Sequence, residues 1–232
     1  MWNNFGKQLY DNIIANDRWL MYLEGLGNTV IMTLCAAVIG IIIGMLVAIC
    51  KVNAKESRNP LMKVLNVICD IYLTVIRGTP MMVQLLIFAW VIFTSVPISQ
   101  LLWVGILAFG INSGAYAAEI IRSGIQAVNK GQMEAGRSLG MSKGLTMRKI
   151  ILPQAVKNIL PALGNEAITL LKETSISCYL AITDITYVAT MIRSRTFSPV
   201  PLLTIAVIYL AIVMLMTFGL RKLERRLSKS ER

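Results

Sequence analysis

The sequence predicts an all-α membrane protein that crosses the bilayer about five times. Of its 232 residues, 56% are hydrophobic and only 15% are charged, and the mean hydropathy is +0.65. A soluble domain of this length would need more polar surface. Several uncharged runs also reach the roughly 20 residues that a helix needs to span the hydrocarbon core.

Each expected span is an apolar stretch bounded by charged or turn-forming residues. The expected spans cover residues 25–50, 61–94, 101–121, 159–183 and 196–220. The stretch Ser95–Gln100 separates the second from the third, because its proline and polar residues favour a turn. We therefore expect an extracytoplasmic segment at 1–24, a transmembrane domain at 25–220 and a basic cytoplasmic tail at 221–232.

Most of the 23 lysines and arginines follow the first, third and fifth spans. These clusters contain Lys51, Lys55, Arg58 and Lys63; Arg122, Lys130, Arg137, Lys143, Arg148, Lys149 and Lys157; and Arg221, Lys222, Arg225, Arg226, Lys229 and Arg232. With five crossings all three clusters lie on one side, as the positive-inside rule requires, whereas a sixth crossing would move the first cluster to the other side. The pattern predicts an outer N-terminus and a cytoplasmic C-terminus, and it argues against nucleic acid as the partner of the basic residues.

The second expected span contains a helix-breaking sequence, Arg77-Gly78-Thr79-Pro80. Proline lacks a backbone donor and disfavours helix at the preceding residue, so a kink or unwound turn is expected. Irregular backbone at membrane depth needs protein or a water-filled cavity to satisfy it. The break is either functional or a simple bend packed on a neighbour.

A second local signal lies between the third and fourth spans. Residues 132–139 are expected to form a short helix that ends at Gly140, since glycine suits the left-handed C-cap. Isolated helices shorter than about 12–15 residues are marginal in water. The segment is therefore either a helix that is stabilised by binding to another protein or an ordinary surface loop.

This segment resembles the EAA-x3-G-x9-I-x-LP signature of ABC importer permeases. The matching residues are Glu134, Ala135, Gly140, Ile150, Leu152 and Pro153. Gly136 stands where the signature usually has a third alanine, at a helix cost of up to about 1 kcal/mol. The resemblance implies the type I ABC importer fold, with a coupling helix at about 132–140 that docks on a cytoplasmic ATPase.

Other stretches resemble the polar amino acid branch of that family, which serves glutamine, histidine, arginine or cystine. They are Arg77–Pro80 with Gln84, 115–125, Gly131-Gln132, 160–166 and 170–175. The resemblance implies a multi-pass protein of the bacterial plasma membrane. Its implied partners are an ATPase subunit dimer, a second permease copy or paralogue, and an extracytoplasmic amino acid-binding protein.

The sequence itself offers no chemistry for catalysis. It has no Gly-x4-Gly-Lys-Ser/Thr phosphate loop, no histidine and no Cys-x2-Cys pair. We expect no cofactor or metal on this chain, with ATP bound by the partner subunit. The chain is accordingly not expected to be an enzyme.

Charged residues within the spans are the candidates for a substrate pathway. A charge at the centre of a membrane helix costs about 2.5–3.5 kcal/mol on insertion scales, so such residues normally face a partner or water. The predicted pathway residues are Arg77, Glu119, Glu166, Thr169 and Glu173. The alternative is that Arg77–Glu119 and Lys172–Glu173 are ion pairs that lock helix packing.

Three other functional classes compete with the importer. An ion-gradient-driven amino acid carrier usually has more crossings and internal repeats. An intramembrane enzyme would need a nucleophile–base pair or a metal-ligand cluster. A structural scaffold leaves the six-position cytoplasmic signature unexplained.

Overall fold

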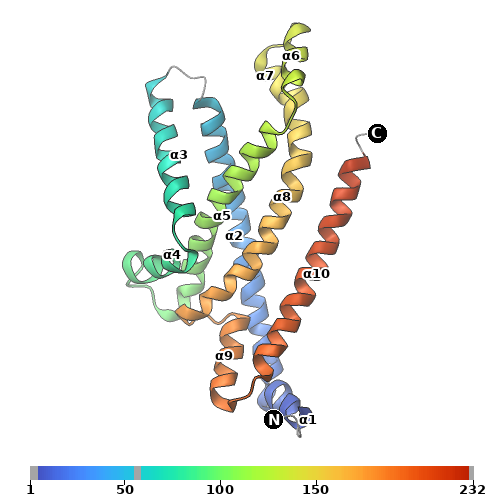
Figure 1. Cartoon of the computed structure of the whole chain (residues 1–232). Coiled ribbons are helices and arrows are strands. Elements are labelled where there is room, and N and C mark those ends of the chain that lie inside the picture. Colours follow the sequence, from blue (N-terminus) through green and yellow to red (C-terminus); the bar gives the residue numbers. More distant parts are fainter. Residues whose placement is uncertain (1–4, 55–58, 230–232) are drawn as a thin grey trace. The chain divides into compact units, whose positions relative to one another are not determined.

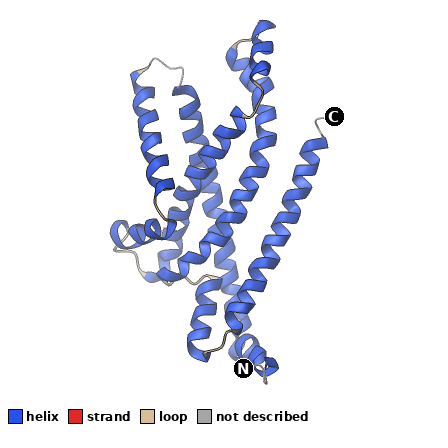
Figure 2. Ribbon diagram, viewed as in Figure 1, coloured by secondary structure: helices blue, strands red, loops and turns tan. Residues whose placement is uncertain are grey.

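The computed structural model describes residues 5–54 and 59–229, and all regular structure within them is helical (Figure 2). The all-α prediction is therefore confirmed for this part of the chain. Residues Lys55 and Arg58 of the first basic cluster, and Arg232 of the last, lie outside the described residues.

The elements follow one another along the chain as labelled in Figure 1. The N-terminal pieces are α1 (Phe5–Leu9), the π-turn η1 (Tyr10–Ile14) and the 3-10 turn η2 (Ala15–Asp17). They are followed by α2 (Arg18–Ala54), α3 (Pro60–Gly78), α4 (Met81–Ile87), η3 (Phe88–Ile92), η4 (Ile98–Gln100) and α5 (Leu101–Gln126). The remainder is α6 (Lys130–Ser138), α7 (Lys143–Thr146), η5 (Met147–Ile151), α8 (Leu152–Glu173), η6 (Thr174–Leu180), α9 (Ile185–Thr196) and α10 (Val200–Lys229).

Length and composition allow three to five membrane spans. Three stretches qualify on their own: Gly6–Ala54, Ile98–Gln126 and Val200–Leu227. Two further spans arise if each bent pair counts once, Pro60–Gly78 with Met81–Ile92 and Lys143–Leu180 with Ile185–Thr196. The upper number equals the five crossings expected from the sequence.

Several helix ends differ from the expected span limits. Helix α2 begins at Arg18 and not near residue 25, and the region expected to be a loop between the last two spans contains the 12-residue helix α9. The basic stretch after residue 220 continues α10 up to Lys229, so it is an extension of the last helix. Charges near helix ends do not stop a helix, because long basic side chains can reach the polar interface.

The expected break in the second span is present. Helix α3 ends at Gly78, and Thr79 and Pro80 adopt extended backbone (φ −118°, ψ 145° and φ −63°, ψ 137°) before α4 begins. The Thr79 hydroxyl donates to the Val75 carbonyl at 2.8 Å. This bond gives the Val75 carbonyl, in the last turn of α3, a side-chain partner.

The chain divides into two compact units that are described separately. The first comprises 1–37, 80–110 and 168–217, and the second 38–79, 111–167 and 218–232. In the first unit, Tyr22 of α2 packs with buried apolar residues of α9 and with Ile205 of α10. Asp184, fully buried, caps α9 by accepting from the Tyr187 amide at 2.7 Å.

The second unit is held together by close packing of its helices. Ala48 of α2, Ile121 of α5 and Ala155 and Ile159 of α8 form one buried cluster. A β-carbon at Gly124 would lie 2.4 Å from Ile159 Cγ1, so α5 approaches α8 as closely as only glycine allows.

Candidate functional site

The signature segment forms a compact projection in the second unit, beyond the start of α8 (Figure 1). Asn129 caps α6 by accepting from the Gly131 amide at 2.8 Å. The helix ends before Gly140, whose φ of 81° confirms the predicted left-handed C-cap. Leu139 next to it is 81% exposed.

One face of α6 is buried by its own unit and the other is open. Gly136 is buried, whereas Glu134, Ala135 and Arg137 are exposed. A β-carbon at Gly136 would lie 2.5 Å from Thr146 Cγ2 and 2.9 Å from Thr146 Oγ1. The departure from the alanine of the signature therefore lets α6 pack directly on the buried Thr146.

The second half of the signature connects this projection to α8. Ile150 lies in the π-turn η5, and Leu152 and Pro153 begin α8. Because η5 leads into α8 without a break, Pro153 lies inside a continuous helical stretch, where it cannot donate the backbone hydrogen bond of its position. The Gln154 side chain donates to the Ile150 carbonyl at 2.9 Å, which ties the π-turn to the helix.

A charged cluster lies elsewhere in the same unit, between α3 and α5. Arg77 Nη1 is 3.9 Å from Glu119 Oε2, which confirms the predicted pair, and the Arg77 guanidinium lies 5.7 Å from the centre of the Tyr116 ring. Glu119 also accepts two hydrogen bonds from Arg122, one of them from Nε at 3.0 Å. One carboxylate thus offsets two cations.

These groups border a pocket of about 540 Å³. Its lining residues are Lys51, Asp70, Leu73, Thr74, Arg77, Gly78, Glu119 and Arg122. Lys51 and Asp70 form an ion pair, and Asn66 donates to Asp70 at 2.9 Å. The pocket presents donors and acceptors of both charges, which are the groups that a zwitterion would contact.

The other predicted pathway residues have different surroundings. Glu166 is half-buried and accepts from the Ser113 hydroxyl of α5 at 3.0 Å, within the second unit. Thr169 and Glu173 belong to the first unit, where Thr169 is exposed and Glu173 half-buried. Leu170, the neighbour of Thr169, is buried, so these two side chains face different environments.

Four residues that make these contacts were not among the predicted pathway residues. They are Lys51, Ser113, Tyr116 and Arg122, the last of which is the main partner of Glu119. For Ser113 a signal existed, since Asn112 and Ser113 interrupt an otherwise apolar span and both are buried. Buried polar side chains in a membrane helix usually have a specific partner.

The described residues thus form a helical membrane protein with a short capped helix outside its long apolar helices and with ion-paired residues around a pocket. The family of binding-protein-dependent transport system inner membrane components matches residues 40–229. The chain belongs to this family, and it is accordingly a multi-pass component of the inner membrane. This assignment favours the ATP-driven importer over an ion-gradient-driven carrier.

Two relatives of this chain are named for the transport of particular amino acids. The chain is 39% identical over 211 residues to the GlnP chain of Rickettsia typhi, named for a glutamine transport system, covering 90% of this chain and 93% of that one. It is 37% identical to the arginine transport system permease protein ArtQ of Bacillus subtilis, with the same coverage of both chains.

Two solved structures resemble this chain in fold. A chain in the crystal structure of an amino acid ABC transporter with histidines has a TM-score of 0.81 and 41% identity, covering 89% of this chain and 94% of that chain. A chain of the MetNI methionine ABC transporter in an inward-facing conformation has a TM-score of 0.76 at 16% identity, covering 92% and 99%, and supports the fold alone.

Proposed function

We propose that this chain forms the translocation pathway of an ATP-driven importer for polar amino acids and that α6 couples it to a separate ATPase. The observation that carries the proposal is the packing of Gly136 on Thr146, which buries one face of α6 and leaves Glu134 and Ala135 exposed. A nine-residue helix is marginal by itself, but the contact with Thr146 holds α6 in place, so that its exposed face is available to a partner protein.

The assembly follows from what one chain lacks. Up to five spans provide half of a pathway, so a second permease copy or paralogue is expected around a two-fold axis. The sequence contains no phosphate loop, so we expect ATP to be bound by a partner ATPase dimer. No cofactor or metal of this chain's own is part of the proposal. An extracytoplasmic binding protein delivers the amino acid to the outer side, where the N-terminus lies, and the basic clusters and C-terminus face the cytoplasm.

Relatives named for glutamine and arginine transport support an amino acid as the substrate. The proposed pathway residues are Arg77, Glu119, Glu166, Thr169 and Glu173. Closure of the ATPase pair draws the two α6 helices together and opens the cavity outward, and hydrolysis returns it inward. The proposed coupling residues are Glu134, Ala135, Gly136, Gly140, Ile150, Leu152 and Pro153.

Charge reversal on the exposed face of α6 tests this function. The complex with Glu134→Lys, purified with its ATPase and reconstituted in vesicles, should lose ATP-dependent uptake and binding-protein-stimulated hydrolysis. Arg148→Glu, an exposed charge reversal on η5, is the matched control and should retain most uptake. Undiminished coupled uptake in Glu134→Lys would show that this face of α6 is not the ATPase contact.

A further inference from the structure

Two cysteines face each other where the end of α2 runs beside α3, within the second unit (Figure 1). Cys50 lies one turn before the end of α2, and Cys69 lies near the middle of α3. The two side chains are hydrogen-bonded to each other, and both are half-buried free thiols. The pair therefore joins two helices that follow each other along the chain.

Contacts on either side hold the two helices at this register. Lys51 and Asp70, which directly follow the two cysteines, form an ion pair between α2 and α3. Val47, one turn earlier on α2, packs on the buried cluster that contains Leu73, one turn later on α3. Residues three or four apart share a helix face, so each cysteine lies on the same face as these neighbours. The ion pair and the apolar contact thus keep the thiols opposed.

A polar reagent has a route to these thiols. Lys51 and Asp70 also line the pocket of about 540 Å³ that Arg77 and Glu119 border. Charged side chains in membrane helices normally face a partner or water, so this pocket suits small polar solutes. A half-buried cysteine usually acts as a small apolar packing residue. Two thiols in contact beside a polar pocket instead favour chemistry between them.

We propose that Cys50 and Cys69 are a reversible oxidation site, at which a small-molecule disulfide of the glutathione type generates an intrachain disulfide. The thiolate of one cysteine attacks the S–S bond of the reagent, forms a mixed disulfide and releases one molecule of the reduced thiol. The second thiolate then attacks the cysteine sulfur of the mixed disulfide and releases the other molecule. The two cysteines lose two protons and two electrons, which the reagent takes up as its S–S bond breaks.

The bond would fix α2 against α3 under oxidising conditions alone. Disulfides in contact with the cytoplasm are usually transient and respond to the redox state. A bridge requires Cα atoms within about 7 Å, so thiols that already touch need little helix movement. This oxidation is independent of the substrate and of the proposed coupling by α6.

Peptide mapping of the full-length chain, purified with its associated subunits, tests the proposal. The reduced complex is exposed to millimolar oxidised glutathione, alkylated and digested without reductant. Mass spectrometry should detect the peptides of Cys50 and Cys69 joined, with two hydrogen atoms fewer than their sum, and dithiothreitol should separate them. Cys35 and Cys178 should remain alkylated, and Cys35→Ser/Cys178→Ser should form the bond at the wild-type rate.

A matched control moves one thiol along the same face of α2. Val47→Cys/Cys50→Ser displaces it by three residues, roughly 4.5 Å along the helix axis, so the bond to Cys69 should form at most about one tenth as fast. Equal rates in this variant and in wild type would overturn the site. Separate glutathione adducts on Cys50 and Cys69, or a bond between two copies of the chain, would also overturn it. Wild-type mapping gives these outcomes even if a variant does not fold.

Discussion

Thr146 occupies the space that a side chain at Gly136 would need. A β-carbon at Gly136 would approach Thr146 Cγ2 to 2.5 Å, and Thr146 is fully buried with its hydroxyl donating to the Ser142 carbonyl at 3.0 Å. A β-branched side chain fixed in this way has little freedom to move aside. Glycine is thus required at a position where the family signature has alanine.

Gly136→Ala should therefore destabilise the projection although alanine is the better helix former. We expect a loss of about 1–3 kcal/mol from overpacking, read as a lower unfolding temperature of the purified chain. Thr146→Ala removes both colliding atoms, so Gly136→Ala/Thr146→Ala should be more stable than Gly136→Ala alone. Additive losses in the double variant would contradict the contact.

The effect of a substitution at Gly140 should depend on how well the new residue adopts a positive φ, and not on the size of its side chain. Its φ is 81° and no atom would lie within 4 Å of an added β-carbon. Gly140→Asn should be nearly neutral, Gly140→Val should lose about 1–2 kcal/mol, and Gly140→Pro should abolish uptake while membrane insertion persists. Uptake assays with parallel measurement of inserted protein distinguish these effects, and equal behaviour of the asparagine and valine variants would contradict a backbone cause.

Glu166→Gln separates the charge of this residue from its packing. Glutamine can still accept from Ser113, so the helix contact seen at 3.0 Å is retained while the negative charge is lost. If Glu166 contacts the amino acid, the variant should raise the KM for uptake about tenfold or more, as expected for a charged hydrogen bond of about 1.5–3 kcal/mol. Ser113→Ala is the control for packing alone; the ligand role is excluded if Glu166→Gln transports like wild type with normal ATPase coupling.

The Asp184 cap of α9 should be sensitive to loss of the acceptor oxygen. Asp184 accepts from the Tyr187 amide, and its backbone lies so close to Gly25 that a β-carbon there would approach the Asp184 carbonyl oxygen to 2.9 Å. Asp184→Ala should cost about 1 kcal/mol or more, whereas Asp184→Asn keeps the acceptor and should cost less. Thermal unfolding in detergent compares the two, and equal losses would mean that the carboxylate charge matters and not the cap.

Local sequence rules predicted the features that depend on local chemistry. Pro80 indicated the end of α3, Gly140 indicated the left-handed end of α6, and the opposite charges of Arg77 and Glu119 indicated their pair. Each of these follows from one residue type or from a strong charge preference.

Features set by tertiary contact could not be read in this way. The bond between Ser113 and Glu166 joins residues 53 positions apart. The pair of Glu119 and Arg122, by contrast, has i,i+3 spacing on α5, so a local rule could have indicated it. By local rules the glycine at position 136 only weakens a helix, because Thr146 packs against it only in the folded chain. Helix ends such as Arg18 and Lys229 were missed because uncharged runs mark the hydrocarbon region and not the helix itself.

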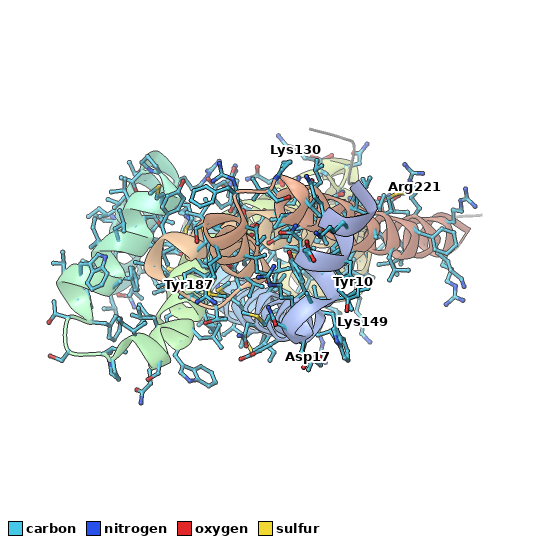
Figure 3. All side chains as sticks on the ribbon, turned by 90° about the horizontal axis from the view of Figure 1, so that it is seen from below. Tyr10, Asp17, Lys130, Lys149, Tyr187 and Arg221 are labelled. Carbon is cyan, nitrogen blue, oxygen red and sulfur yellow. The ribbon has the colours of Figure 1, made fainter. Side chains whose placement is uncertain are left out.

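Helix α10 runs without interruption from its apolar part into its basic part, and this limits its position along the membrane normal. Residues 200–220 carry no charge and, at 1.5 Å per residue, measure about 31 Å, close to the thickness of the hydrocarbon core. Arg221, Lys222, Arg225 and Arg226 follow directly on the same helix and, at 3.6 residues per turn, lie on one face within an arc of about 140° (Arg221 is labelled in Figure 3). Sliding α10 by one turn toward its N-terminal end would move Arg221 and Lys222 into hydrocarbon, at about 2.5–3.5 kcal/mol for each charge at the centre and less near the edge. The last helix is therefore anchored along the membrane normal, so during transport it can tilt or rotate far more easily than it can travel up and down.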